Sequence, residues 1–323
     1  MKTNKLLAAL LTAASLAAPA GAQASFPERT IRIVVPFAAG GGVDSAARLL
    51  AHQLQAQLGV AVIIDNRAGA NGVLGGKAVE TAQADGYTLL FSAATHVLAQ
   101  QVLKHPPYDP QADFTAVARV AEAPLMLVLA PQTPPSKLSD VLAYAKGQGE
   151  RWTAAIPAAG APSHLATLML AQQAGTRFTY VTYKGTQPAA VDVAGGHVQM
   201  LLDSMVSLLP LSKANRVKPV MVTSAKRTPL APDVPTAQES GYPGLTYASW
   251  YGVWAPKGLP ADRLRQLNSA INAAVAEQAR QGAWAMQGLE AAPANGPDEF
   301  KRYVAQYVAQ SASVLKAAGF KPE

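Results

Sequence analysis

Along most of the chain, short apolar runs alternate with segments in which apolar residues recur every three or four positions. The β-branched run at residues 31–35 predicts a strand. Apolar residues at helical spacing from Ala47 to Leu58 predict a helix that ends at Gly59. By the same criteria, further strands are predicted at residues 60–64, 87–91, 125–129, 152–155, 178–182, 198–202, 217–222 and 251–254. Further helices are predicted at residues 77–83, 138–146, 163–174, 188–194, 208–214, 260–279 and 297–318. Strands that alternate with helices in this way imply right-handed crossovers, so the predicted fold class is α/β with a mostly parallel sheet.

One segment interrupts this alternation. Residues 228–244 contain four prolines and predict a connecting loop around a short helical turn. Within it, Thr236 and Glu239 have the spacing of a capping box, in which each side chain accepts a hydrogen bond from the other residue's backbone N–H.

The first residues have the features of a secretory signal peptide. Lys2 and Lys5 precede an apolar run at residues 6–18, and small residues at 20–24 complete the pattern. The alternative is a transmembrane anchor, which is disfavoured because a spanning helix needs about 20 apolar residues. We therefore expect residues 1–24 to be a cleaved signal peptide and the mature chain to be exported.

Composition excludes several protein classes. The chain has 323 residues, of which 50% are hydrophobic and 15% charged, which excludes a disordered chain and favours two lobes over one. The absence of cysteine excludes disulfide scaffolds, thiolate zinc sites and cysteine nucleophiles. The formal charge of +7 becomes +5 once Lys2 and Lys5 leave with the signal peptide. The remaining basic residues form no cluster, so no nucleic-acid partner is expected.

The chain carries no motif for catalysis or cofactor binding. Its five histidines show no HExxH spacing, so no metal site is predicted. The G-x-S-x-G nucleophile elbow and the G-x-G-x-x-G dinucleotide pattern are both missing, and Gly76-Lys77 lacks the flanking residues of a P-loop. The sequence therefore indicates no enzyme class and no cofactor.

Three loops rich in glycine or alanine each join a predicted strand to a predicted helix. They cover residues 36–44, 158–165 and 183–186. Small residues let bare backbone approach a ligand, and the free N–H groups and positive dipole end of a helix N-terminus attract a carboxylate or phosphate. The alternative is that small residues only permit tight turns. Recurrence in both halves of the chain favours an anion-binding role.

Residues near these loops have alternative roles. Asp44 either caps its own helix, which the N-cap preference favours, or faces a ligand amine. Asp203 ends a predicted strand at the edge where open α/β sheets bind ligands, or it caps the helix that follows. His164 either donates to a carboxylate or has a structural role. The aromatic residues at 250–254 are expected in core and hinge packing.

Several motifs, in order along the chain, resemble those of one protein family. Residues 31–37 read IRIVVPF and residues 40–44 read GGGVD. Further motifs are DNRAGANG at 65–72, DGYTL at 85–89, YDP at 108–110, YKG at 183–185, PDVPT at 232–236 and WYG at 250–252. Together they resemble the Bug family, the TctC-like periplasmic solute-binding proteins of tripartite tricarboxylate transporters. The resemblance covers essentially the whole chain after the signal peptide.

The resemblance implies a two-lobed periplasmic-binding-protein fold of the Venus flytrap, type II-like, with a mostly parallel sheet and flanking helices in each lobe. It also implies a periplasmic location, a small carboxylate ligand in the interlobe cleft, a two-component membrane permease of the tripartite tricarboxylate type as partner, and no catalysis. A monomer without a cofactor is expected. Carried over by position, the ligand-binding residues are Phe37, Ala38, Ala39, Gly40, Gly41, Asp44, Ser92, Ala159, Gly160, Ser163, His164, Tyr183, Lys184, Gly185, Thr186 and Asp203.

The second loop departs from the family pattern. Where relatives often show Ser-x-Gly-x-Gly-Ser, this chain has Ile156, Ala158 and Ala161, so hydroxyl contacts are lost. The class of ligand is therefore better indicated than its identity.

We predict that residues 25–122 and 248–323 form the first lobe and residues 123–247 the second, with hinges near Pro124 and Trp250. Two other functions share the exported α/β pattern. One is a ligand-sensing periplasmic partner of a membrane receptor. The other is an exported α/β enzyme, against which the missing nucleophile elbow and metal spacing argue.

Overall fold

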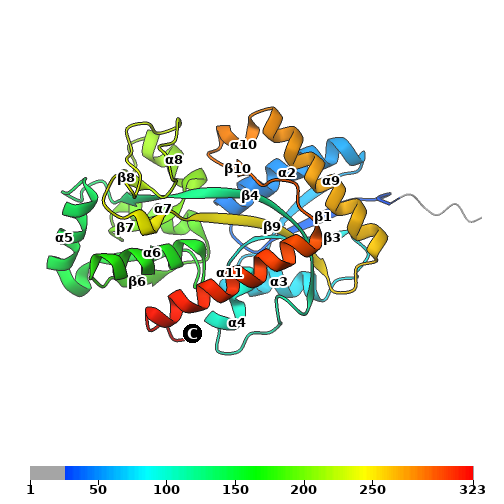
Figure 1. The fold of residues 1–323 in the computed structure, drawn as a ribbon, viewed down its shortest axis with the longest axis horizontal. Helices are drawn as coiled ribbons and strands as arrows, with labels where there is room; N and C mark the ends of the chain where they lie inside the picture. Colours follow the sequence, from blue (N-terminus) through cyan, green and yellow to red (C-terminus); the bar gives the residue numbers. More distant parts are fainter. Residues whose placement is uncertain (1–25, 323) are drawn as a thin grey trace, which may run out of the picture.

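Two long antiparallel strands connect the two halves of the sheet in the computed structural model, which describes residues 26–322. Strand β4 (Phe114–Leu129) pairs with β9 (Ala248–Pro256) along its first part. Along its last part it pairs with β7 (Met200–Ser204) and β8 (Lys218–Val222). Figure 1 shows β4 and β9 side by side across the middle of the molecule. The predicted signal peptide lies outside the described residues.

The other strands lie on either side of this pair, and the main strand order is β2-β1-β3-β9-β4-β7-β5-β6. Their bounds are β1 (Ile31–Val35), β2 (Val62–Asn66), β3 (Thr88–Ala93), β5 (Thr153–Ile156), β6 (Thr179–Thr182) and β10 (Glu290–Ala291). We call the half that contains β1–β3 the first lobe and the half that contains β5–β8 the second lobe.

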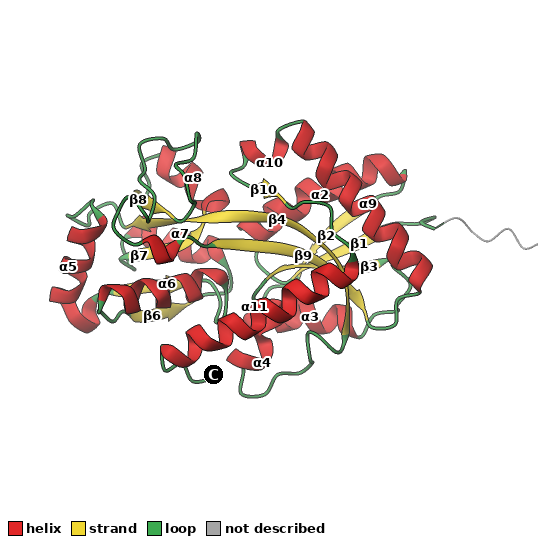
Figure 2. Cartoon of the chain, in the orientation of Figure 1, coloured by secondary structure: helices red, strands yellow, loops and turns green. Residues whose placement is uncertain are grey.

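Helices cover both lobes, as Figure 2 shows. Those of the first lobe are α2 (Gly42–Leu58), α3 (Val73–Glu80), α4 (Ala99–Val102), α9 (Ala261–Arg280), α10 (Ala283–Met286) and α11 (Pro297–Ala317). Those of the second lobe are α5 (Leu138–Gln148), α6 (Pro162–Ala174), α7 (Thr186–Gly195) and α8 (Met205–Lys213). Single 3₁₀ turns occur at Ala70–Gly72, His96–Leu98, Gly149–Arg151 and Pro243–Leu245. Within residues 26–322, no helix combines the length and apolar character required to cross a membrane.

The α/β fold class is confirmed, and the strand directions refine it. Strands joined by helical crossovers are parallel, namely β1 with β2 and β3, and β5 with β6 and β7. The long strands β4 and β9 run antiparallel to their neighbours, so each lobe has a mixed sheet where a mostly parallel one was expected. The strand predicted at residues 125–129 is only the end of β4. Its first part escaped prediction because alanines and Pro124 separate Thr115, Val117 and Val120, so no continuous β-branched run marks the strand.

Several helices begin before their predicted starts, α3 and α8 among them. The helix predicted at residues 77–83 is α3, which begins at Val73 despite two helix-disfavouring glycines. A Cβ on Gly75 would lie 2.7 Å from the Pro36 Cα, and a Cβ on Gly76 would overlap the Tyr108 hydroxyl. These glycines therefore let α3 pack closely on its neighbours. The helix predicted at residues 208–214 is α8, which begins at Met205.

The predicted capping box is confirmed. The Thr236 N–H donates to Glu239 Oε2 at 2.8 Å, and the Glu239 N–H donates to Thr236 Oγ1 at 3.1 Å. Each residue thus satisfies a backbone donor that the short turn leaves free.

An aromatic cluster fixes α11 against the two long strands. The ring centroid of Trp250 lies 5.8 Å from that of Phe300 and 5.3 Å from that of Tyr307. Trp250 and Trp254 are buried, which confirms their expected place in the core. Beyond the end of α11, Phe320 packs edge-on against His164 of the second lobe, with ring centroids 5.3 Å apart. The C-terminal segment therefore contacts both lobes.

Gly252 is the point of closest approach between β9 and this cluster, because a Cβ there would overlap the Phe300 ring. We expect Gly252→Ala to lower the free energy of unfolding by about 2 kcal/mol through overpacking. Urea denaturation followed by circular dichroism measures the change. Gly147→Ala is the control, since no atom lies within 4 Å of a Cβ there, and it should leave stability unchanged or slightly higher. Equal stability of both variants would contradict the packing account.

Candidate functional site

The N-termini of four helices converge on one pocket between the lobes. The N-cap residues are Gly41 of α2, Ala161 of α6, Gly185 of α7 and Ser204 of α8, and all four line the pocket. None of these helix starts has a side-chain cap hydrogen bond. The first-turn N–H groups of a helix have no partner within the helix and carry its positive dipole end. The pocket is therefore an environment that favours an anion.

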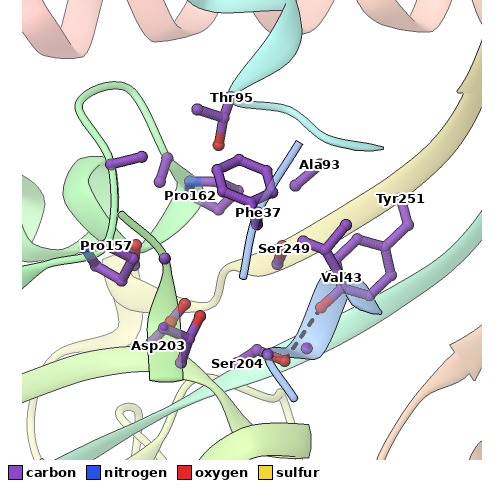
Figure 3. A pocket seen from close by; sticks show the side chains of 17 residues that line it. Phe37, Val43, Ala93, Thr95, Pro157, Pro162, Asp203, Ser204, Ser249 and Tyr251 are labelled. Carbon is purple, nitrogen blue, oxygen red and sulfur yellow. Dashed lines mark hydrogen bonds between the residues drawn. The ribbon is translucent and has the colours of Figure 1, made fainter. Parts of the chain in front are cut away.

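The walls of the pocket come from both lobes and from β9. It is lined by Phe37, Gly41, Gly42, Val43, Ala93, Thr95, Pro157, Ala158, Ala161, Pro162, Ser163, Gly185, Thr186, Asp203, Ser204, Ser249 and Tyr251. Figure 3 shows Asp203 and Ser204 on one side of the pocket and Phe37, Pro162 and Thr95 on the other. No lysine, arginine or histidine is among the lining residues, so anion binding here depends on backbone N–H groups and hydroxyls.

The pocket is narrow. The volume open to the centres of water molecules is about 30 Å³. By the same measure, one water molecule needs roughly 10–15 Å³. A larger solute therefore enters only when the lobes separate or the lining side chains move.

Close contact between the lobes depends on Gly42. The Ser204 and Tyr251 hydroxyls are 3.1 Å apart and hydrogen-bonded, as the dashed line in Figure 3 marks. A Cβ on Gly42 would lie 2.8 Å from the Ser204 Oγ. Only glycine lets the start of α2 approach this pair without displacing it.

Two buried polar groups in the pocket have no hydrogen-bond partner within residues 26–322. They are the Ser163 hydroxyl and the Asp203 Oδ2, in residues that are 1% and 7% exposed. Burial raises the pKa of Asp203 to about 6, although the nearby Thr186 hydroxyl and Ser204 N–H oppose the shift. Burial also raises the pKa of Tyr251 to about 12, so its hydroxyl is neutral at physiological pH.

Asp44 holds the first loop in place from outside the pocket. Its carboxylate accepts hydrogen bonds at 2.9 Å from the Gly40 N–H, Arg48 Nε and Asn66 Nδ2. Burial alone would raise the pKa of Asp44, but these bonds outweigh it and the pKa is lowered. The side chain therefore orders the loop before α2 and does not line the pocket, and it is not the cap of α2, whose N-cap is Gly41.

His164 also lies outside the pocket and orders the second loop. Its Nδ1 accepts a hydrogen bond from the Gly160 N–H at 3.1 Å, and its ring packs against Tyr180 and Phe320. Burial lowers the pKa of His164 to about 4. Gly160 has a φ of +70°, and a Cβ there would lie 2.8 Å from the Val102 Cγ1 across the interface.

Several other residues carried over from the family lie outside the pocket. The Tyr183 hydroxyl donates to Asp192 Oδ2 at 2.7 Å, and Lys184 is exposed. Ser92 is buried in β3 opposite Gly252. Ala38, Ala39, Gly40 and Ala159 also do not line it. The pocket brings together Phe37, Gly41, Ser163, Gly185, Thr186 and Asp203 from the predicted set.

Several lining residues were not predicted from the sequence, for different reasons. Ala93 follows Ser92 directly, but alternation along a strand points successive side chains to opposite faces, and Thr95 lies just beyond the end of β3. Tyr251 lies in the aromatic segment that was expected in the core, Ser249 comes directly before that segment, and Ser204 adjoins Asp203. The adjacency to Asp203 was the one available signal. Within the described residues, no cluster of three or more metal-ligating side chains is found.

The buried His164 makes stability depend on pH. The unfolded chain protonates this histidine below a pKa of about 6.5, whereas the folded chain does so only near 4. Stability is therefore complete above pH 6.5 and falls as the pH drops toward 4, by up to about 1.4 kcal/mol per pH unit for one histidine. The free energy of unfolding of His164→Asn, measured with urea between pH 7 and 4.5, should change less steeply with pH than that of the natural chain. His105→Asn, at an exposed position, is the control and should keep the natural slope. An unchanged slope in His164→Asn would contradict the account.

Comparison with known proteins gives consistent results. The profile of the "Tripartite tricarboxylate transporter family receptor", TctC, matches residues 46–320. Protein BugT of Bordetella pertussis is 35% identical to this chain over 326 aligned positions, which cover 99% of both proteins.

Solved structures share the whole fold. The periplasmic binding protein BugD has a TM-score of 0.86 at 35% identity and covers 92% of this chain and 100% of its own. Rpa4515 of R. palustris with adipate has a TM-score of 0.88 at 32% identity, with coverage of 92% and 100%. MatC of Rhodopseudomonas palustris with bound malate has a TM-score of 0.83 at 31% identity, with coverage of 90% and 100%. The family profile and these full-length matches agree with the sequence motifs, and the chain belongs to the TctC family of tripartite tricarboxylate transporter receptors.

Proposed function

We propose that this protein captures a small carboxylate solute between its lobes in the periplasm and delivers it, unchanged, to a two-component membrane permease of the tripartite tricarboxylate type. The observation that carries the proposal is the convergence of four uncapped helix N-termini on one interlobe pocket. A carboxylate placed there accepts hydrogen bonds from backbone N–H groups and meets the positive ends of the helix dipoles.

The ligands of the relatives support the same chemistry. The two Rhodopseudomonas structures contain adipate and malate, both of which are dicarboxylates. The pocket of this chain pairs apolar surfaces at Phe37 and Ala93 with hydroxyls at Thr95 and Ser249. Such a lining suits a short carbon chain with polar ends.

Binding without catalysis fits the lining residues. Only Asp203 and Tyr251 among them are titratable, and no lining histidine, lysine or cysteine is available as a base or nucleophile. Because one chain supplies every wall of the pocket, a monomer is sufficient for binding.

The chain crosses between the lobes twice, and the lobes would close by a hinge motion at these two crossings. We assign residues 25–122 and 248–323 to the first lobe and 123–247 to the second, with hinges near Pro124 and Trp250. In support, Pro124 pairs with Ala248 where β4 passes from β9 to β7, and proline provides no ladder N–H at that point. Ligand contacts to both lobes would then favour the closed state over the open one.

A screen of small carboxylates tests the function. Purified mature protein at pH 7.5 should show a raised melting temperature with at least one mono- or dicarboxylate at millimolar concentration, because a ligand that binds only the folded state stabilises it. Ser163→Ala removes a buried hydroxyl of the pocket and should weaken binding of that ligand by about fivefold. Ser313→Ala, on an exposed face of α11, is the control and should bind as the natural chain does. A melting temperature that no carboxylate changes would contradict the proposed function.

Asn71 offers a test of closure. Its Nδ2 donates to the Ala159 carbonyl oxygen at 2.9 Å and joins the two lobes, while its own φ is +56°. Asn71→Gly removes this bond and keeps a residue that favours a left-handed backbone. We expect ligand affinity to fall by about fivefold, since the bond exists only between closed lobes.

The matched control for closure is Asn215→Gly, at an exposed position with a φ of +54° in the second lobe. Isothermal titration calorimetry of both variants measures the difference. If Asn71→Gly binds the ligand as tightly as Asn215→Gly, the contact does not contribute to closure.

A further inference from the structure

The proposed pocket contains two buried polar groups with opposite hydrogen-bonding requirements. The Ser163 hydroxyl, in the first turn of α6, can donate to a ligand oxygen. The Asp203 Oδ2 at the end of β7 can only accept when the carboxyl is ionised. Neither atom has a hydrogen-bond partner within residues 26–322.

Neither ion pairing nor the nearby Thr186 hydroxyl and Ser204 N–H satisfies both carboxylate oxygens of Asp203. It forms no ion pair with any described residue, and the pocket lining includes no cation. A cap for α8 was the alternative, and the Ser204 N–H does lie near the carboxylate, but no described residue donates to Asp203 Oδ2. A buried carboxylate oxygen without a donor is costly, so the folded chain retains it at the expense of stability. Figure 3 shows the Asp203 carboxylate directed into the pocket, toward the side with Pro157 and Phe37.

The helix N-termini and Asp203 therefore favour different chemical groups on one ligand. The helix starts favour a carboxylate, whereas a second carboxylate against Asp203 would place two negative charges together in a buried site. A ligand group that donates a hydrogen bond would instead give Asp203 Oδ2 the partner that it lacks. Since burial raises the pKa of Asp203 only to about 6, the side chain is ionised and accepting at pH 7.5.

We propose that Asp203 selects ligands that carry a hydrogen-bond donor, so that the solute is a hydroxy- or amino-substituted carboxylic acid whose carboxylate lies at the helix N-termini. This inference rests on the proposed function and narrows its substrate class. Hydroxyl and ammonium groups share the donor chemistry, and the test below distinguishes them.

The first arm compares ligands that share a carbon skeleton. Calorimetry at pH 7.5 measures three series: propionate, lactate and alanine; succinate, malate and aspartate; glutarate, 2-hydroxyglutarate and glutamate. In the series that fits the pocket, a donor-bearing member should bind at least about tenfold more tightly than the plain acid. Preference for the hydroxy or the amino member identifies the donor. Equal or tighter binding of the plain acid overturns the inference and leaves the proposed function intact, whereas no binding in any series contradicts both.

The second arm uses Asp203→Asn, which keeps the shape of the side chain and adds an amide donor. It should weaken the donor-bearing ligand by about tenfold and strengthen the plain acid, so that the order of affinities reverses. Asp233→Asn, at an exposed position, makes the same change of charge and should keep the natural order. An unchanged order in Asp203→Asn overturns the inference.

The melting temperature of the unliganded Asp203→Asn variant separates a binding role from a structural role, because the two roles predict changes of opposite sign. Because Asp203→Asn removes a buried charge whose Oδ2 has no donor, the unliganded protein should melt at the same or a higher temperature. A large decrease would mean that Asp203 serves the fold, and the inference would be wrong. The ligand series on the natural chain does not depend on how this variant folds.

Discussion

Four helix starts converge on a narrow pocket, and each brings backbone N–H groups that the helix itself cannot satisfy. This constraint organises the rest of the site. Buried backbone donors need partners, and none of the four starts takes one from a capping side chain. The loops that deliver the helices are built from small residues for the same reason, since backbone must approach both the ligand and the opposite lobe. Gly42 and Gly160 show the second requirement directly, because a Cβ on either would come within 2.8 Å of the facing lobe.

The long strands β4 and β9 explain how such a pocket can open. They connect the two lobes as one antiparallel ladder, and each lobe adds its parallel strands to the outside of that ladder. The aromatic cluster under α11 fixes the first lobe, and the segment after α11 reaches the second lobe through Phe320 and His164. Motion of the lobes must therefore bend the ladder and adjust this C-terminal contact together.

Much of the fold was predictable from the sequence because its signals are local. Helical spacing and β-branched runs located most elements, and the capping box at Thr236 and Glu239 formed as its spacing required. The first part of β4 was missed because a strand rich in alanine depends on pairing with β9, which no local pattern reports. The glycines of α3 were informative only once Pro36 and Tyr108 were seen to pack on them.

The site was predictable at the level of loops and not of side chains. Gly41, Gly185 and Thr186 line the pocket. Each lies where a loop from a strand enters a helix, and the backbone geometry of that connection is set locally. His164 and Tyr183 belong to the same loops but face Gly160 and Asp192, since the direction of a side chain depends on tertiary packing. Asp203 lines the pocket with an unpaired oxygen, a property that burial and partners define and that spacing alone does not.

The central claim is that backbone N–H groups at the helix starts hold the carboxylate of the solute. The most direct measurement is a ¹H–¹⁵N NMR titration of the mature protein with the carboxylate that raises its melting temperature most. Our account predicts that the largest shift changes cluster at the first-turn amides of α2, α6, α7 and α8, from Gly42, Ser163, Thr186 and Met205 onward. The account would be contradicted if these amides did not shift when the protein is saturated with ligand and the largest shift changes lay elsewhere on the protein.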